Sequence, residues 1–315
     1  MLSGLESVGV VFLIFAAGYF MHCKKLWPDG TPEALSNIVV RVSAPCLAVT
    51  SIVSGWDRAM LASSLVMLLI AALHFFALML LAKFTSRLLS LGGGRKAVYE
   101  VSFTFSNVIF IGLPINQIVF GESGLPVLFI YFVASLTLFW SIGNYMIARE
   151  APPAFREKPG QYNIARVFNP GLIGVMVGVA LVQAQVALPP VVGPALGYLA
   201  ALTVPLSLLV IGANLTMFSK GIPRVTRDEV FVVLAKFAAS PLIMFALLKL
   251  FAVSGLPFYV FLLSSSMPCH MQASIIAKHH GVEPAYAAKL VGLTTLLSIV
   301  TIPCYVAIIH GMMAA

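Results

Sequence analysis

Two apolar segments of the sequence each combine a proline with amide or imidazole side chains. The first, at residues 106–117, reads SNVIFIGLPINQ, and the second, at residues 264–272, reads SSSMPCHMQ. A proline inside a helix removes a backbone donor and displaces carbonyl groups, which a bilayer tolerates only where they are buried in protein or line a wet cavity. Two such breaks in corresponding places of two half-chains predict a binding site near the middle of membrane-spanning helices.

The groups around the two breaks suit a small anion. The half-helix after each proline is expected to direct unpaired N–H groups and the positive end of its dipole toward the bilayer centre. Amide and imidazole side chains then fix a planar carboxylate without a full buried charge. The predicted substrate contacts at the breaks are Asn107, Gly112, Pro114, Asn116, Pro268, Cys269, His270 and Gln272. The alternative is that the amides only join helices.

The composition places these segments in a membrane. Hydrophobic residues make up 60% of the 315 residues and charged residues 10%, which exceeds the apolar content that a soluble core needs. We therefore predict an all-α polytopic membrane protein. Its ten expected spans are residues 4–22, 33–54, 60–83, 97–120, 124–148, 168–187, 192–217, 228–252, 256–279 and 285–310.

The basic residues predict how these spans are oriented. Fifteen of the nineteen Lys and Arg residues follow odd-numbered spans, and only Arg58 and Lys249 belong to the alternate loops. Because cytoplasmic loops collect Lys and Arg, both termini are predicted outside a plasma (inner) membrane. The net charge of +8 is thereby explained without nucleic acid. The first span is interpreted as a retained helix and not as a signal peptide.

Short internal similarities predict an inverted repeat. Residues 35–45 resemble 196–205, and residues 121–141 resemble 281–298. Five spans per half is an odd number, so the two halves must be inserted in opposite orientations. We expect a first repeat at residues 1–150, a cytoplasmic linker at 151–167 and a second repeat at 168–315. The alternative is that any two proline-containing membrane helices look alike.

Several motifs together resemble the auxin efflux carrier family. They are Asn107 with GLP at 112–114 and NQIVFG at 116–121, Asn169-Pro170, Pro205 with LLVIGANL at 208–215, and PCHMQASIIAKHHGVEP at 268–284 before LTTLLSIVTIP. The chain is most similar to the bacterial branch, whose members resemble malonate and malate carriers. It lacks the long central loop of the plant branch, which puts kinase-type regulation in doubt.

The resemblance implies a fold related to the bile-acid sodium symporters. Helices 1, 2, 6 and 7 would form a scaffold, and helices 3–5 and 8–10 a moving core, as in an elevator carrier. It adds Asn169 and Pro45 to the predicted substrate contacts, because plant members hold substrate between scaffold and core. The second break lacks the carboxylate of the bile-acid symporters, which weakens any transfer of their sodium sites.

The coupling ion is left open by the sequence. All eleven acidic residues fall in expected loops or at span ends, and only His74 and His270 are titratable in mid-span. Proton coupling, sodium coupling and uniport are therefore all retained. Arg41 and Lys236 are expected to snorkel to the interface, although Arg41 on a scaffold helix is alternatively suited to attract anions.

Other functional classes fit less well. The four cysteines show neither CxxC nor zinc spacing, so we expect no metal site and no cofactor. Gly121-Glu122-Ser123-Gly124 matches the GxSG of intramembrane serine proteases, with His310 as the histidine at a suitable depth, but these glycines are explained by a turn. A membrane sensor is the other alternative.

The expected function is a non-enzymatic carrier of a small organic anion, a mono- or dicarboxylate such as malonate or an auxin-like acid. Whether the carrier is a homodimer is left open.

Overall fold

The computed structural model describes residues 4–56, 58–155, 168–219, 221 and 224–314, and these are mostly helical, with no β-strand among them. Six helical segments are long and apolar enough to cross a membrane: Thr31–Gly55, Ser64–Leu88, Gly124–Ala148, Val192–Phe218, Arg227–Leu250 and Pro284–Ala314. Shorter apolar helices are Gly9–Cys23, Val108–Phe120, Pro170–Ala184 and Leu256–Ser265. The prediction of an all-α polytopic membrane protein is confirmed at this level.

The first half of the chain runs through long helices interrupted by short π- or 3₁₀-helical turns, which are labelled η. In order, they are α1 (Gly4–Cys23), α2 (Thr31–Ile38), η1 (Val39–Ser43), α3 (Ala44–Gly55), α4 (Arg58–Leu88), α5 (Gly93–Thr104), η2 (Val108–Gly112), α6 (Leu113–Phe120), α7 (Gly124–Leu138), η3 (Phe139–Gly143), α8 (Asn144–Ala148) and η4 (Pro153–Phe155).

The second half follows a similar pattern. It contains α9 (Pro170–Ala184), α10 (Val192–Ala201), α11 (Thr203–Asn214), η6 (Leu215–Phe218), α12 (Arg227–Leu234), η7 (Ala235–Ala239), α13 (Ser240–Leu250), α14 (Leu256–Ser265), α15 (Met271–His279) and α16 (Pro284–Ala314). Gly121 after α6 and Gly281 after α15 both have a positive φ, near +66° and +64°, as the predicted glycine turns require.

Glycines allow one set of helices to pack with their backbones in contact. α1 lies against α11, and α3 lies against α9 and α10. A Cβ at Gly212 would collide with the carbonyl of Phe15, and one at Gly18 with the carbonyl of Leu209. On α9, a Cβ at Gly174 would lie 2.6 Å from the carbonyl oxygen of Pro45. Such close contacts are how membrane helices gain packing energy without a hydrophobic driving force between them.

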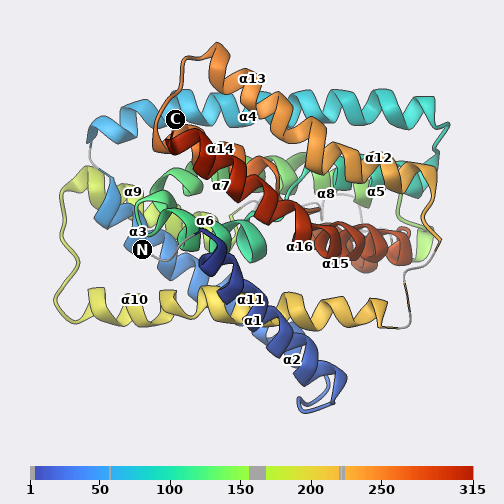
Figure 1. The fold of residues 1–315 in the computed structure, drawn as a ribbon, viewed down its shortest axis with the longest axis horizontal. Coiled ribbons are helices and arrows are strands. Elements are labelled where there is room, and N and C mark those ends of the chain that lie inside the picture. Colours follow the sequence, from blue (N-terminus) through green and yellow to red (C-terminus); the bar gives the residue numbers. More distant parts are fainter. Residues whose placement is uncertain (1–3, 57, 156–167, 220, 222–223, 315) are drawn as a thin grey trace.

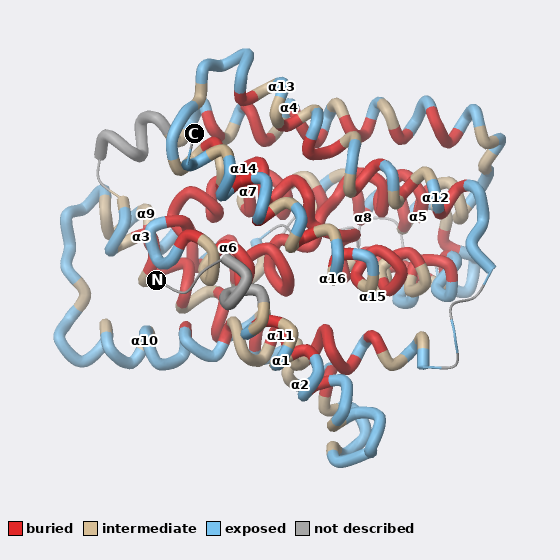
Figure 2. The backbone as a smooth tube through the Cα atoms, in the orientation of Figure 1, coloured by how far each residue is buried: buried red, intermediate tan, exposed pale blue. Residues whose placement is uncertain are grey.

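The remaining helices pack around a buried centre. α4 contacts α5, α7 and α13, and α16 contacts α5, α14 and α15. α4 and the α10–α11 segment run along opposite edges of the molecule, with α6, α7 and α14 between them (Figure 1). Figure 2 shows that buried residues concentrate in this middle region, whereas the outer faces of α4 and α10 are exposed.

The N-terminal ends of three of these helices are tied by ion pairs. Arg95 at the start of α5 makes a 2.9 Å ion pair with Asp228 on α12, and its guanidinium lies 4.0 Å from the ring centroid of Tyr286 on α16. Lys289 on α16 makes a 2.7 Å ion pair with Glu229 on α12. These contacts therefore join α5, α12 and α16 at this end.

Prolines inside the helices produce wide turns more often than breaks. η1, η2 and η7 each end two residues before a proline, namely Pro45, Pro114 and Pro241. Because proline cannot donate to the preceding turn and its ring needs space, an i→i+5 turn accommodates it within a continuous helix. The prediction that Pro114 marks the break in its helix was wrong: the break lies at residues 105–107, before η2, and Pro114 sits in the first turn of α6.

Candidate functional site

Two broken helices cross at the centre of the molecule. α5 ends at Thr104 and the helix resumes at Val108, while α14 ends at Ser265 and α15 begins at Met271. The two extended stretches pair antiparallel at Ser106 and Cys269. Asn107 N donates to Pro268 O at 2.8 Å, and His270 N donates to Phe105 O at 3.1 Å. Each break thus satisfies backbone groups that the other leaves open, as burial requires.

Short polar side chains explain why the helices end here. The hydroxyls of Ser264, Ser265 and Ser266 bond back to carbonyls three or four residues earlier, which competes with helix continuation. The Asn107 side-chain oxygen accepts from Phe110 N at 3.2 Å and caps η2. Asn107 is therefore a helix cap as well as a predicted substrate contact.

The segment around η7 reaches both breaks. Lys236 Nζ donates to Phe105 O at 2.7 Å and to Ser106 Oγ at 3.3 Å, and its side chain is fully buried. One helical turn later, Ser240 Oγ donates to Ser265 O at 2.6 Å. The expectation that Lys236 snorkels to the interface was wrong, because the crossing offers this buried side chain two acceptors. Arg41 is exposed.

His74 on α4 is held by three hydrogen bonds. Its Nε2 lies 3.1 Å from both the carbonyl oxygen and Oγ of Ser240, and its Nδ1 lies 3.4 Å from the hydroxyl of Tyr131. A carbonyl only accepts, so Nε2 carries a proton, and Nδ1 of the neutral ring accepts from Tyr131. Both nitrogens are used, which makes His74 a connector between α4, α7 and α13.

Other polar atoms at the crossing have no partner. His270 Nδ1 and Asn116 Oδ1 are buried and form no hydrogen bond among the described residues. The His270 ring rests edge-on against Phe139, with centroids 4.5 Å apart. Asn116 uses its nitrogen for Gly112 O at 2.7 Å. Because an unpaired buried polar atom costs about 1–3 kcal/mol, both are candidates for ligand contacts.

The remaining predicted contacts separate into two places. Pro268 and Cys269 lie in the crossing itself, where Cys269 N donates to Thr294 Oγ1 on α16 at 3.1 Å. Gly112 lies beside the crossing: a Cβ added at this residue would lie 3.4 Å from the Met267 side chain. Gln272 is half-buried in the first turn of α15.

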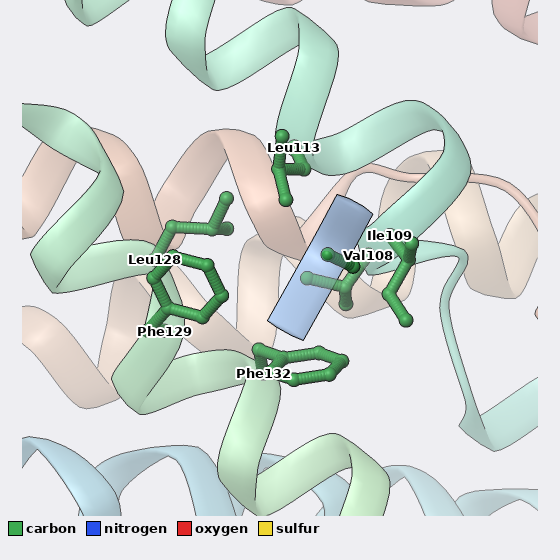
Figure 3. Close-up of a pocket in the computed structure, with 7 residues that line it drawn as sticks. Val108, Ile109, Leu113, Leu128, Phe129 and Phe132 are labelled. Carbon is green, nitrogen blue, oxygen red and sulfur yellow. The ribbon is translucent and has the colours of Figure 1, made fainter. Parts of the chain in front are cut away.

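Pro45 and Asn169 lie near a small apolar cavity. Asn169 caps α9 by accepting from Leu172 N at 3.1 Å, and Gly174 packs on Pro45. The cavity is lined by Ala44, next to Pro45, and by residues of η2, α6 and α7 (Figure 3). Its volume is about 10 Å³, room for no more than a single water, so an organic anion requires the walls to move apart.

Comparisons with known proteins show the family of the chain. A family model described as membrane transport protein matches residues 3–306. The chain belongs to this family. It is the auxin efflux carrier family, so the resemblance inferred from the sequence is confirmed. An uncharacterised transporter of Methanothermobacter thermautotrophicus is 24% identical over 95% of this chain and 96% of its own length. Another, from Methanocaldococcus jannaschii, is 23% identical over the same shares.

Membership of a membrane transport family shows a multi-pass transporter and not an enzyme. The protease alternative finds no support in the GxSG turn: Ser123 Oγ donates to Phe120 O at 2.9 Å, and among the described residues no histidine bonds to it. No cluster of three or more His, Cys, Asp or Glu side chains that could hold a metal ion occurs in the described ranges.

Sequence reasoning missed three residues of this transporter's crossing. Lys236 was assigned to the interface, although the proline five residues later was a signal for a turn near it. Thr294 on α16 had no distinctive signal. Asn214, the last residue of α11, lies in the quoted LLVIGANL motif and donates to Met271 Sδ at 3.3 Å, beside the start of α15. A motif asparagine at a helix end was the available signal.

Proposed function

We propose that the chain is a secondary carrier for a small organic anion, a mono- or dicarboxylate such as malonate or an auxin-like acid. The anion binds where the two broken helices cross. The observation that carries the proposal is that the start of α15 and the Lys236 ammonium meet at one buried carbonyl: His270 N and Lys236 Nζ both donate to Phe105 O, and His270 Nδ1 is unpaired among the described residues. Together these offer positive charge and hydrogen bonds to a carboxylate.

Movement of a core against a scaffold is the proposed mechanism. α1–α3 and α9–α11 are proposed as the scaffold, because glycines hold α1 to α11 and α3 to α9. α4–α8 and α12–α16 are proposed as the core, supported by the crossing and by the ion pairs of α5, α12 and α16. The small apolar cavity lies between the two groups, so sliding there would open the site to one side at a time.

An inverted repeat is the proposed origin of this arrangement. In both halves a broken helix is followed by a positive-φ glycine and a long apolar helix: α5–α6 by Gly121 and α7, and α14–α15 by Gly281 and α16. We propose residues 1–150 and 168–315 as the two repeats, with residues 151–167 as the linker. We also propose an inner-membrane location with both termini outside, and the charge distribution supports this orientation.

A sodium-coupled symporter of the bile-acid type is the second candidate. It rests on carbonyl groups freed by the breaks, which in other transporters hold sodium. Here the freed Phe105 carbonyl is occupied by Lys236 Nζ at 2.7 Å. That contact favours a carrier without a sodium site at this carbonyl.

Counterflow in proteoliposomes tests the proposal. Purified protein is reconstituted in vesicles loaded with unlabelled malonate or indole-3-acetate, and uptake of the labelled acid is measured. A carrier gives saturable uptake that requires the internal acid, whereas protein-free vesicles give none. Lys249→Met, at an exposed lysine far along the α12–α13 segment, is the matched control for reconstitution. Absence of counterflow for a panel of carboxylates, with the control folded, would refute the anion-carrier proposal.

A further inference from the structure

Lys236 is a buried cation without an anionic partner. It lies in η7, near the middle of the Arg227–Leu250 segment, and its exposed fraction is 0%. Among the described residues, no carboxylate lies within ion-pair distance of its Nζ. An unpaired charge at such a position is expensive and in membrane proteins usually has a function.

The groups around Nζ resemble the ligands of a small cation. Phe105 follows the last residue of α5, so its carbonyl lies at the negative end of that half-helix. Nζ contacts this carbonyl at 2.7 Å and the Ser106 hydroxyl at 3.3 Å. Backbone carbonyls at the C-terminal end of a broken helix, joined by a hydroxyl, are the kind of ligand set that holds a dissociable coupling ion in transporters.

The Phe105 carbonyl already accepts from a neutral donor, the backbone nitrogen of His270 at 3.1 Å. Ser240, one turn further along the same helix face, satisfies Ser265 O of the second break with an uncharged hydroxyl at 2.6 Å. Hydrogen bonding alone therefore does not account for a lysine at 236.

We propose that Lys236 is a tethered cation that occupies the place of a coupling ion at the crossing. It gives the site a fixed positive charge for the anion and leaves no vacancy for sodium at the Phe105 carbonyl. The consequence for transport rests on the proposed carrier function, whereas the occupancy of the cation position does not. Transport is then sodium-independent, and removing the ammonium creates a sodium site.

Thermal unfolding of the full chain in detergent tests the occupancy. The wild type should have the same melting temperature in sodium, potassium and choline chloride at equal ionic strength. Lys236→Ser removes the ammonium from the position but leaves an oxygen. Its melting temperature should be lower than that of the wild type in choline chloride, and sodium should raise this temperature selectively. Lys249→Met should behave as the wild type. Sodium-specific stabilisation of the wild type, or none in folded Lys236→Ser, would overturn the proposal.

Transport gives the second readout and covers the case in which Lys236→Ser does not fold. Lys236→Met keeps the length of the side chain without its charge, and malonate counterflow should fall by about tenfold or more. Wild-type counterflow should be equal in sodium and choline. A sodium-stimulated wild type, or a Lys236→Met protein with the wild-type rate, would refute the tethered cation. If the wild type transports no carboxylate, the anion-carrier proposal fails, while the melting experiment still decides the occupancy.

Discussion

Two buried histidines show how side-chain partners separate structural from ligand-binding roles. The sequence placed both histidines in the middle of predicted membrane spans and did not distinguish their roles. In the structure His74 uses both nitrogens on Ser240 and Tyr131, whereas His270 Nδ1 has no partner within the described residues and its ring packs edge-on against Phe139. His270 is therefore the histidine that a ligand would use, and His74 fixes α4 to its neighbours.

Replacing each histidine by phenylalanine should have opposite effects on stability. His270→Phe keeps a ring against Phe139 and removes an unpaired buried nitrogen, so the free energy of unfolding should be unchanged or higher by about 1 kcal/mol. His74→Phe removes the hydrogen bonds of the ring to Ser240 and Tyr131 and should lower the free energy of unfolding by about 1–3 kcal/mol. Because both make the same change in ring size, the difference isolates the hydrogen bonds.

Melting temperatures in detergent, with and without malonate, measure both changes. Malonate should stabilise the wild type but not His270→Phe. A wild-type response to malonate in His270→Phe would remove this side chain from the proposed binding site, and equal destabilisation by the two changes would contradict the contrast in their hydrogen bonds.

The helices show what the sequence could and could not predict. The apolar runs correctly predicted an all-helical membrane protein, because length and hydropathy are enough to indicate apolar helices, and six described segments are long enough to span a membrane. The break in the Gly93–Phe120 stretch was placed at Pro114 because proline was treated as a breaker. Its true position at residues 105–107 depends on partners from α14–α15 and on Lys236, which sequence spacing does not reveal. Asn107 as a cap was the local signal.

Pro114 and Asn107 should therefore respond differently to substitution by alanine. Pro114→Ala lets the π-turn of η2 close into α-helix and should leave counterflow within about twofold of wild type. Asn107→Ala removes a cap worth about 1 kcal/mol and an amide facing the crossing, so both stability and counterflow should fall. Proteoliposome counterflow and melting temperature measure the pair. Loss of transport in Pro114→Ala with normal folding would restore that proline to the site.

The close approach of α1 and α11 should not tolerate a side chain. Gly212→Leu would push against the Phe15 carbonyl, so the yield of folded, monodisperse protein and its melting temperature should fall sharply. Gly197→Leu is the matched control on neighbouring α10, where a Cβ meets nothing within 4 Å. Size-exclusion chromatography of detergent extracts compares the two. Equal yields for the two variants would show that the glycine contact contributes little to the proposed scaffold.

At the scale of the whole molecule, charge serves two purposes that the sequence alone could not separate. Arg95 and Lys289 were counted with the basic residues that orient the chain, yet each also pairs with an acidic residue on α12. The orientation prediction rests on the remaining basic residues of the same loops. The loops that hold these residues still follow the odd-numbered predicted spans, so the proposed placement of both termini outside is unchanged.

Single cysteines should report this orientation directly. In a background with Cys23, Cys46, Cys269 and Cys304 replaced by serine, cysteines at exposed Glu122 and Pro189 should react with a membrane-impermeant maleimide in intact cells. These positions follow α6 and α9, at ends that the basic residues avoid. Cysteines at exposed Ser90 and Lys278 should react only after permeabilisation.

The two pairs provide controls for each other, because all four side chains are exposed and differ only in the predicted side. Each half of the chain contributes one position to each side, so the pattern tests the inverted insertion of the halves together with the overall orientation. Reaction of Ser90→Cys and Lys278→Cys in intact cells, with protection of the other two, would show that the orientation is the reverse of the predicted one. Reaction of one position from each pair would instead contradict the opposite insertion of the two proposed repeats.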